Sequence, residues 1–317
     1  MYGLDSDLLP ILEDWHARGH RAALATLVSV CGSSPRPLGS EMAVNDAGEV
    51  AGYVSGGCVE ASVAAEARQV LANGEPVMLD YGTGSPVLDV RLACGGRIGI
   101  LVWSPGDLGI YTSALRGARD ARHAITRDLD LRDGTYRFAA RPSSEPGEHV
   151  FRQRHVPPSR LVLVGGDPVT LALCRQAPML GFEVVLLRPS GPPEPPPGMP
   201  VTHYDNRRLD KALNELRIDP YSAVYTLAHD MDDDHAVLTA ALASDAFAIG
   251  ALGSKRKAAE RFQRLRAEGF DEDRIERVSS PAGHDIGAQG PQEIALSILA
   301  ELLESRPRDS ARMASAA

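Results

Sequence analysis

Two short loops rich in glycine and serine carry the residues of this sequence best suited to chemistry. One reads Gly32-Ser-Ser-Pro-Arg-Pro-Leu-Gly39 and the other Ser55-Gly-Gly-Cys-Val-Glu60. Small residues let backbone amides approach a ligand closely. The second loop leads into an Ala-rich stretch with helical periodicity over residues 59–71, so the positive end of a helix dipole favours an anion there. The candidate anion-binding residues are Ser33, Ser34, Arg36, Gly56 and Gly57. The alternative for Arg36 is a surface arginine without a ligand.

Two cysteines are the candidate catalytic thiols. Cys58 lies at the start of the helix predicted over residues 59–71, where the dipole stabilises a thiolate. Cys94 lies in Leu92-Ala-Cys-Gly-Gly96, a strand end broken by glycines, which indicates a close backbone approach or a bulge. The alternative for Cys58 is a small buried side chain that packs in a tight turn, and the alternative for Cys94 is a bulge with a buried thiol. Cys31 and Cys174 have apolar neighbours in the sequence and are expected to pack.

A dinucleotide fingerprint is incomplete in the second half of the chain. Gly165-Gly-Asp-Pro-Val-Thr170 lies where Gly-x-Gly-x-x-Gly would follow the first strand of a Rossmann domain. Asp167 replaces the second glycine, and the next predicted strand is followed by Arg188 in place of an acid. Arg188 favours a 2′-phosphate, and its alternative is a solvated loop arginine. Gly165 and Arg188 are therefore candidate cofactor-binding residues, with NAD(P) as a candidate cofactor but without a complete fingerprint.

Three further segments of the second half carry polar side chains. Ser254 and Lys255 open a cationic helix after Gly250-Ala-Leu-Gly253, which suits phosphate but lacks the spacing of a P-loop. The pair His284-Asp285 precedes the last predicted helix and either faces a ligand or caps that helix. The segment 229–235 has two histidines and four aspartates, but it matches no standard metal-ligand spacing. Its aspartates are expected to cap a helix.

The first half of the chain predicts a compact mixed α/β module over residues 1–103. Strand patterns cover residues 22–30, 76–81 and 90–103, and residues 41–45 and 50–55 flank Asp46-Ala-Gly48 as in a hairpin. Between residues 104 and 158 the periodicity fades, and residues 142–158 are rich in Pro, Ser, Glu and Arg. We therefore expect residues 104–158 to form an extension and linker.

Strands and helices alternate from residue 159 onward. Strand patterns recur at residues 160–165, 183–187, 223–227 and 246–249, separated by helical patterns, and a final helix is predicted over residues 291–304. This alternation predicts a Rossmann-like, doubly wound parallel sheet over residues 159–305. Residues 306–317 are expected to form a disordered tail.

Composition excludes several classes of protein. The 317 residues carry 33 Lys and Arg against 42 Asp and Glu, a net charge of −9, which does not favour nucleic acid or an anionic membrane surface. No apolar run reaches the length of a membrane-spanning helix. Four cysteines without a Cys-x-x-Cys pair do not form a disulfide scaffold. We therefore expect a cytoplasmic protein with neither nucleic acid nor membrane as a partner.

Taken together, these segments resemble the XdhC/CoxI family, the accessory proteins of xanthine dehydrogenase and carbon monoxide dehydrogenase type molybdenum enzymes. The resemblance follows family order along nearly the whole chain and omits mainly residues 104–158. The chain departs from the family pattern at Asp167 and Arg188. The matching stretches are Gly32–Gly39, Val54–Glu60, Ala93–Arg97, His229-Asp230, Gly250–Lys257, Asp285–Ala288 and Glu293–Glu301.

The resemblance implies an N-terminal XdhC/CoxI module, a C-terminal Rossmann domain and a homodimer. It also implies a protein that binds molybdenum cofactor, protects it during sulfuration and delivers it to an apo molybdenum hydroxylase, with a cysteine desulfurase as a further candidate partner. In that role Cys58 is the candidate ligand for molybdenum or carrier of sulfur. This function involves no turnover of its own.

Two alternatives remain open. One is an NAD(P)-dependent oxidoreductase in which Cys58 and Cys94 exchange electrons or form a disulfide with a small-molecule thiol. The other is a regulatory module that senses a nucleotide.

Overall fold

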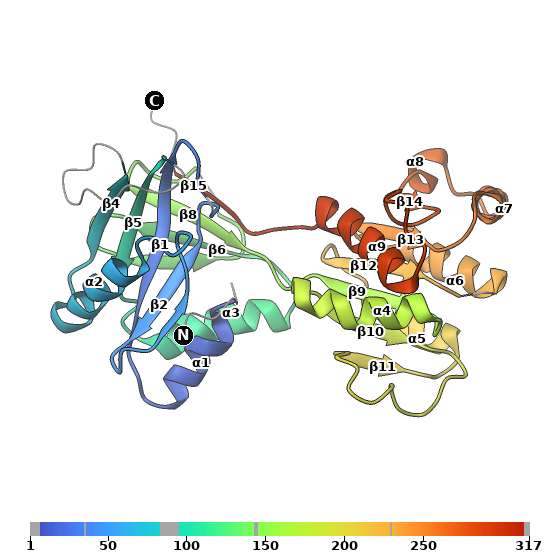
Figure 1. The fold of residues 1–317 in the computed structure, drawn as a ribbon, viewed down its shortest axis with the longest axis horizontal. Coiled ribbons are helices and arrows are strands. Elements are labelled where there is room, and N and C mark those ends of the chain that lie inside the picture. Colours follow the sequence, from blue (N-terminus) through green and yellow to red (C-terminus); the bar gives the residue numbers. More distant parts are fainter. Residues whose placement is uncertain (1–6, 35, 83–94, 143–144, 229, 314–317) are drawn as a thin grey trace. The chain divides into compact units, whose positions relative to one another are not determined.

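The chain folds into two units. The computed structural model describes residues 7–34, 36–82, 95–142, 145–228 and 230–313 (Figure 1). The first unit extends to Pro157 and includes the segment from Arg308 onward, and the second unit comprises Pro158–Pro307.

The first unit is built on a five-stranded antiparallel sheet. Its order is β3-β2-β1-β5-β4, and the strands are β1 (Ala22–Cys31), β2 (Glu41–Asn45), β3 (Val50–Gly52), β4 (Val77–Gly82) and β5 (Arg97–Trp103). Helix α2 (Glu60–Asn73) covers one face, because alternate residues Ala23, Ala25 and Leu27 of β1 pack with the apolar side of the helix. Residues 46–49 connect β2 and β3, so the hairpin predicted around Asp46-Ala-Gly48 is present.

The opposite face of this sheet packs against two helices and a second sheet. Helices α1 (Leu9–Ala17) and α3 (Leu108–Asp120) lie against each other (Figure 1). The second sheet has the order β15-β8-β6-β7, with β6 (Ile125–Asp130), β7 (Tyr136–Ala139), β8 (Val150–His155) and β15 (Ser310–Met313). Leu24 and Trp103 of the first sheet form one buried cluster with Tyr111, Leu129 and Phe151.

Two expectations about the chain's division differ from the structure. Residues 104–158 are not a linker: they supply α3, β6, β7 and β8 to the first unit, which ends at Pro157. Residues 306–317 are not a disordered tail throughout, because residues 310–313 form β15 and pair with β8. Residues 104–158 look polar in sequence, because charged residues such as Arg127 are buried against partners from distant parts of the chain.

Arg127 of β6 is the clearest example of such a buried charge. Its side chain is fully buried between the two sheets. The guanidinium donates hydrogen bonds to the hydroxyl of Tyr111 (2.5 Å), to Glu41 Oε1 (2.8 Å) and to Gln153 Oε1 (2.7 Å). It also lies 5.2 Å from the centre of the Trp103 ring. Burial opposes its charge, but Glu41 and Tyr111 outweigh that effect and raise the pKa of Arg127 above its ordinary value.

The second unit contains a six-stranded sheet in which every pair of neighbouring strands is parallel. Its order is β11-β10-β9-β12-β13-β14, formed by β9 (Arg160–Val164), β10 (Glu183–Leu187), β11 (His203–Asp205), β12 (Ser222–Thr226), β13 (Ala248–Ala251) and β14 (Val278–Ser279). Counted along the chain this is the 3-2-1-4-5-6 order of a Rossmann fold. The predicted doubly wound parallel sheet is therefore confirmed.

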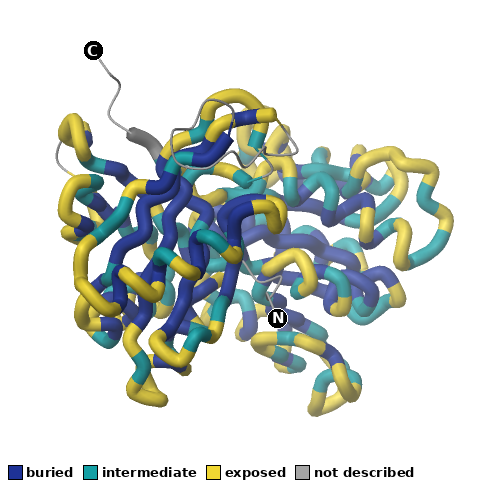
Figure 2. Tube along the Cα trace, turned by 60° about the vertical axis from the view of Figure 1, so that its left-hand side comes forward, coloured by how far each residue is buried: buried dark blue, intermediate teal, exposed yellow. Residues whose placement is uncertain are grey.

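Helices cover both faces of the parallel sheet. Leu161 and Leu163 of β9 pack toward α4 (Pro168–Gln176), the 3₁₀ turn η1 (Ala177–Leu180) and α9 (Pro291–Ser305). Val162 and Val164 face the opposite cluster with α5 (Leu209–Glu215), α6 (Met231–Leu242), α7 (Lys255–Ala267) and α8 (Glu272–Ile275). Figure 2 shows the strands of each unit as mostly buried. Within the described residues, no helix combines the length and the apolar character needed to cross a membrane.

Replacing Arg127 with Met is expected to destabilise the first unit by about 3 to 5 kcal/mol, because the buried partners of the guanidinium lose their donor. Urea unfolding followed by tryptophan fluorescence measures this loss, since both tryptophans, Trp15 and Trp103, belong to the first unit. Arg137→Ala is the matched control: its side chain is 73% exposed and pairs with Asp128 on the same sheet. The control substitution is expected to lower the free energy of unfolding by under about 1 kcal/mol. Equal losses for the two variants would contradict the prediction.

Candidate functional site

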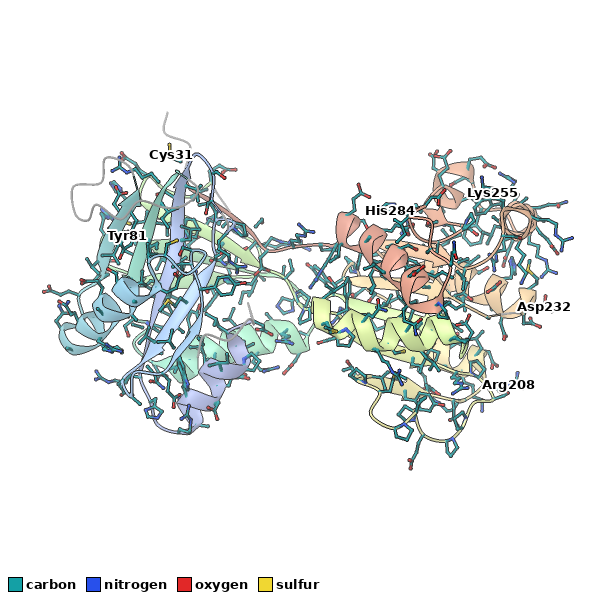
Figure 3. All side chains as sticks on the ribbon, in the orientation of Figure 1. Cys31, Tyr81, Arg208, Asp232, Lys255 and His284 are labelled. Carbon is teal, nitrogen blue, oxygen red and sulfur yellow. The ribbon has the colours of Figure 1, made fainter. Side chains whose placement is uncertain are left out.

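The two glycine-serine loops start at the same end of the five-stranded sheet. The first loop follows β1 and the second follows β3. Both strands are antiparallel to β2, so their carboxyl ends lie at one end of the sheet. The register places Cys31 of β1 and Gly82 of β4 opposite Arg97 at this same end, where Figure 3 labels Cys31.

Close backbone contacts connect the first loop to the start of β5. A Cβ atom on Gly96 would lie 2.2 Å from the carbonyl oxygen of Ser33 and 3.0 Å from that of Cys31. A Cβ on Gly82 would lie 2.4 Å from the carbonyl oxygen of Gly96. Of the two alternatives for the Gly95-Gly96 break, a close backbone approach or a bulge, the close approach is present at Gly96, and a larger residue at position 96 would displace the first loop.

Arg36 connects the first loop to Tyr53, which lies between β3 and the second loop. Its guanidinium carbon lies 4.2 Å from the centre of the Tyr53 ring, and its Nη1 donates to the Tyr53 hydroxyl at 3.3 Å. Ser34 Oγ donates to the carbonyl oxygen of Arg36 (2.9 Å) and so holds the turn. Arg36 Nε is buried without a hydrogen-bond partner among the described residues. A buried donor of this kind is costly unless something else accepts from it, and an anionic ligand would do so.

Glu60 occupies part of the site that the sequence assigned to an anion. Its buried carboxylate accepts hydrogen bonds from the Ser55 amide (2.8 Å), the Ser55 hydroxyl (2.8 Å) and the Val59 amide (3.2 Å). The Cys58 amide donates to Ser55 Oγ at 3.2 Å. The carboxylate of Glu60 therefore supplies the negative charge at the N-terminus of α2, where the sequence predicted a bound anion. The sequence signal that could have revealed this role is an acid in the first helical turn, five residues after Ser55.

The exposed part of the second loop is its tip. Gly56, Gly57 and Cys58 are exposed, while Ser55 and Glu60 beneath them are buried. The structure therefore presents the Cys58 thiol to solvent on a loop held from below by hydrogen bonds. The roles of Ser33, Ser34, Arg36, Gly56, Gly57 and Cys58 remain predictions.

The other cysteines differ in burial. Cys174 is buried, as expected, and desolvation raises the pKa of its thiol to about 12. Cys31 was expected to pack, but it is exposed because it is the last residue of β1, where the sheet is no longer covered. Cys94 lies outside the described residues.

In the second unit, Gly165 and Arg188 line one cavity of about 560 Å³. The cavity lies at the carboxyl ends of β9, β10 and β12. The structure thus brings together the two residues that the sequence singled out for nucleotide binding. The remaining candidates of this unit do not line the cavity.

Those remaining candidates are exposed and lie at the start of α7 and in the loop before α9. Ser254 caps α7 by accepting from the Lys257 amide (3.3 Å), and Lys255 is the exposed first residue of this helix. His284 and Asp285 are exposed in the loop before α9, and His284 Nε2 lies 3.3 Å from Glu304 Oε2. Figure 3 labels Lys255 and His284 at these two places. Ligand binding by these four residues remains a prediction.

The acidic segment before α6 behaves as a helix cap. Asp230 accepts hydrogen bonds from the amides of Asp232 (2.7 Å) and Asp233 (3.1 Å), so the predicted capping is confirmed. His229 lies outside the described residues, and His235 Nε2 lies 2.6 Å from Glu268 Oε2. Within the described residues, no group of three or more His, Cys, Asp or Glu side chains is arranged to hold a metal ion.

Alkylation of the native protein at neutral pH is expected to modify Cys31 and Cys58 well before Cys174. The first two thiols are exposed, whereas Cys174 is buried and its pKa of about 12 leaves almost no thiolate. Peptide mass spectrometry after timed treatment with iodoacetamide measures the three rates. The same treatment in urea is the control, since all three thiols should then react. Native Cys174 reacting as fast as Cys58 would contradict this difference in burial.

Comparison with known proteins matches both units. Residues 161–302 match the family model described as the XdhC Rossmann domain, and residues 15–82 match the model of the XdhC and CoxI family. The segment 83–160 lies between these two matches.

Two curated relatives and one solved structure are similar over most of their lengths. The chain is 30% identical over 300 residues to the molybdenum cofactor insertion chaperone PaoD of Escherichia coli (strain K12), covering 91% of this chain and 84% of the relative. It is 26% identical over 330 residues to a Bacillus subtilis (strain 168) protein named as a probable xanthine dehydrogenase subunit, covering 90% and 94%. A crystal structure described as a xanthine dehydrogenase from Bacillus halodurans has a TM-score of 0.78 at 24% identity, covering 93% of this chain and 94% of that one, and shows the same fold.

Proposed function

This chain belongs to the XdhC and CoxI family, and from that premise we propose that it binds a molybdopterin-type molybdenum cofactor and inserts it into an apo molybdenum hydroxylase of the xanthine dehydrogenase type. The names of its relatives in Escherichia coli and Bacillus subtilis support this role. The observation that carries the proposal is the buried Nε of Arg36, which has no partner among the described residues and lies at the sheet end where both glycine-serine loops begin. The protein acts as a carrier and catalyses no turnover of its own.

The residues at this sheet end fit such a cofactor. A molybdopterin-type cofactor carries a phosphate, and Arg36 with Ser33 and Ser34 would hold it by charge and hydrogen bonds. The exposed Gly56-Gly57 backbone leaves room for the ligand to approach. Cys58 offers a soft sulfur donor suited to molybdenum or to sulfur transfer. When bound, the cofactor supplies the metal centre that the hydroxylase uses, while this chain binds, orients and shields it.

The partners follow from the same proposal. The family resemblance supports a homodimer that meets the apo-hydroxylase and a cysteine desulfurase. Four cysteines in 317 residues, without a Cys-x-x-Cys pair, are consistent with the proposed cytoplasmic location. Light scattering after size exclusion tests the homodimer directly.

The alternative of an NAD(P)-dependent oxidoreductase rests on a Cys58/Cys94 pair, and Cys94 lies outside the described residues.

Replacing Arg36 with Ala is expected to weaken cofactor binding by about 1.5 to 3 kcal/mol, the range for a hydrogen bond to a charged group. Fluorescence titration with isolated molybdopterin-type cofactor measures the change, and circular dichroism checks the fold. Arg68→Ala is the matched control, because Arg68 is an exposed arginine of α2 in the same unit. Equal affinities of the Arg36 variant and the native protein would remove Arg36 from the site.

Replacing Cys58 with Ser is expected to preserve the fold and abolish productive cofactor transfer, because a hydroxyl is neither a soft metal ligand nor a sulfur carrier. Activation of a purified apo-hydroxylase by cofactor-loaded protein measures transfer. Cys31→Ser is the matched control, since Cys31 is also an exposed thiol of the first unit. Full activation by the Cys58 variant would show that transfer depends on groups other than this thiol.

A further inference from the structure

The cavity of the second unit lies where the order of the parallel strands reverses. Strand β9 is the third of six in the sheet, with β10 on one side and β12 on the other. The cavity opens at the carboxyl ends of these three strands and has a volume of about 560 Å³. In open α/β sheets, ligands bind in the crevice at this switch point, and such a volume is ordinary for a small-molecule site. This cavity is formed by residues of the second unit alone.

The part of the cavity that would face a pyrophosphate is modified. Asp167 caps α4, since its Oδ1 accepts from the Thr170 amide (2.7 Å) and the Thr170 hydroxyl (2.6 Å). Pro168 begins the helix and has no amide hydrogen. A carboxylate and a proline thus stand where a Rossmann domain normally presents a glycine and free amides to a pyrophosphate. We therefore expect this end of the cavity to contribute little to the affinity for the pyrophosphate that links the two nucleotides of NAD or NADP.

The cationic side of the cavity is formed by Arg188, the first residue after β10. Its side chain lies across the glycine loop, because a Cβ on Gly166 would be 2.4 Å from Arg188 Nε. The Arg188 amide donates to the Asp205 carbonyl (2.8 Å), and the Gly191 amide donates to the Arg188 carbonyl (2.9 Å), which holds the backbone on both sides. Among the described residues, no carboxylate lies within ion-pair distance of this guanidinium. Arg188 is therefore fixed in place with its charge available to a ligand.

The position of Arg188 selects one part of a nucleotide. In a Rossmann domain an acid at the end of the second strand binds the ribose 2′-hydroxyl, whereas an arginine there accommodates a 2′-phosphate. Here β10 is that second strand, and the residue directly after it is Arg188 in place of an acid. The apolar part of the cavity lining, which suits a flat base, is formed by Pro189, Pro192, Leu227 and Ala228. Asp233 also lines the cavity, so Arg188 must outweigh its carboxylate for a phosphate to bind.

We propose that this cavity binds the 2′-phosphoadenosine part of NADP and discriminates against NAD through Arg188. The discrimination comes from the 2′-phosphate, because the pyrophosphate end is capped by Asp167. This binding site goes beyond the proposed function and does not depend on it, since different residues form the loops of the first unit and the cavity of the second.

Calorimetric titration of the full chain with NADP, NAD, 2′-AMP and 5′-AMP tests the proposal. NADP is expected to bind at least about tenfold more tightly than NAD, and 2′-AMP more tightly than 5′-AMP. A ratio of this size corresponds to the hydrogen bonds of one charged group, here the Arg188 guanidinium with the 2′-phosphate. In the Arg188→Ala variant, the preference for NADP over NAD and the preference for 2′-AMP over 5′-AMP should each fall to under about threefold in affinity. Arg208→Ala is the matched control, because the Arg208 side chain is 80% exposed and pairs with Asp210 outside the cavity (Figure 3).

A second variant separates the two ends of the cavity. Asp167→Asn keeps a capping oxygen for Thr170 and removes the negative charge. It is expected to tighten NAD and NADP alike and to leave their ratio unchanged. Equal affinities for NAD and NADP, a preference that survives Arg188→Ala, or no binding of NADP at millimolar concentration would each overturn the proposal. Loss of cofactor transfer by a Cys58 variant would have no bearing on these results.

Discussion

The buried guanidinium of Arg127 is the interaction on which the first unit depends. It connects the start of β2, through Glu41, to the second sheet, through Gln153. Gln153 Nε2 in turn donates to the carbonyl oxygen of Gly39 at 3.0 Å, so the same network fixes the residue that ends the first glycine-serine loop. Gly39 itself fits tightly, since an added Cβ would lie 3.0 Å from the Gln153 side chain. Residues Arg127 and Gln153 of the segment 104–158 therefore hold the end of the first glycine-serine loop, which belongs to the candidate cofactor site.

A comparable buried pair organises the second unit. Arg261 of α7 donates to Asp234 of α6 (Nε to Oδ2, 3.0 Å) and to the carbonyl oxygen of Leu252 (2.8 Å). Asp234 also accepts from the Thr226 hydroxyl at the end of β12 (2.5 Å). Leu227 and Ala228, which follow Thr226, form part of the cavity wall. The ion pair thus holds the carboxyl ends of β12 and β13 at the edge of the sheet where the cavity opens.

In both units an acidic side chain accepts hydrogen bonds from backbone amides beside the start of a helix. Glu60 accepts from the amides of Ser55 and Val59, which precede α2, and Asp167 accepts from the Thr170 amide in the first turn of α4. A carboxylate beside each helix start opposes an anion there, and both of our proposals therefore assign anion binding to an arginine near each loop. Arg36 has this position in the first unit and Arg188 in the second. This common arrangement explains why both proposed binding modes depend on a guanidinium more than on a helix dipole.

The sequence alone determined the features that depend on neighbouring residues. The alternation of apolar strands and amphipathic helices from residue 160 onward predicted the doubly wound sheet, and glycines predicted the loops at both candidate sites, because period and turn chemistry are local properties. The predicted capping by Asp230 is local in the same sense, since its two amide partners lie within the next three residues.

Only the tertiary structure decided which charges are buried. Arg127 and Glu41 are separated by 86 residues, and β15 pairs with β8 from still farther along the chain, so residues 104–158 and 310–313 looked polar and unstructured. The same reason explains the exposure of Cys31 and the position of four candidate residues outside the cavity. Contact with solvent or ligand depends on distant parts of the chain, which local pattern does not encode. The four residues are Ser254, Lys255, His284 and Asp285.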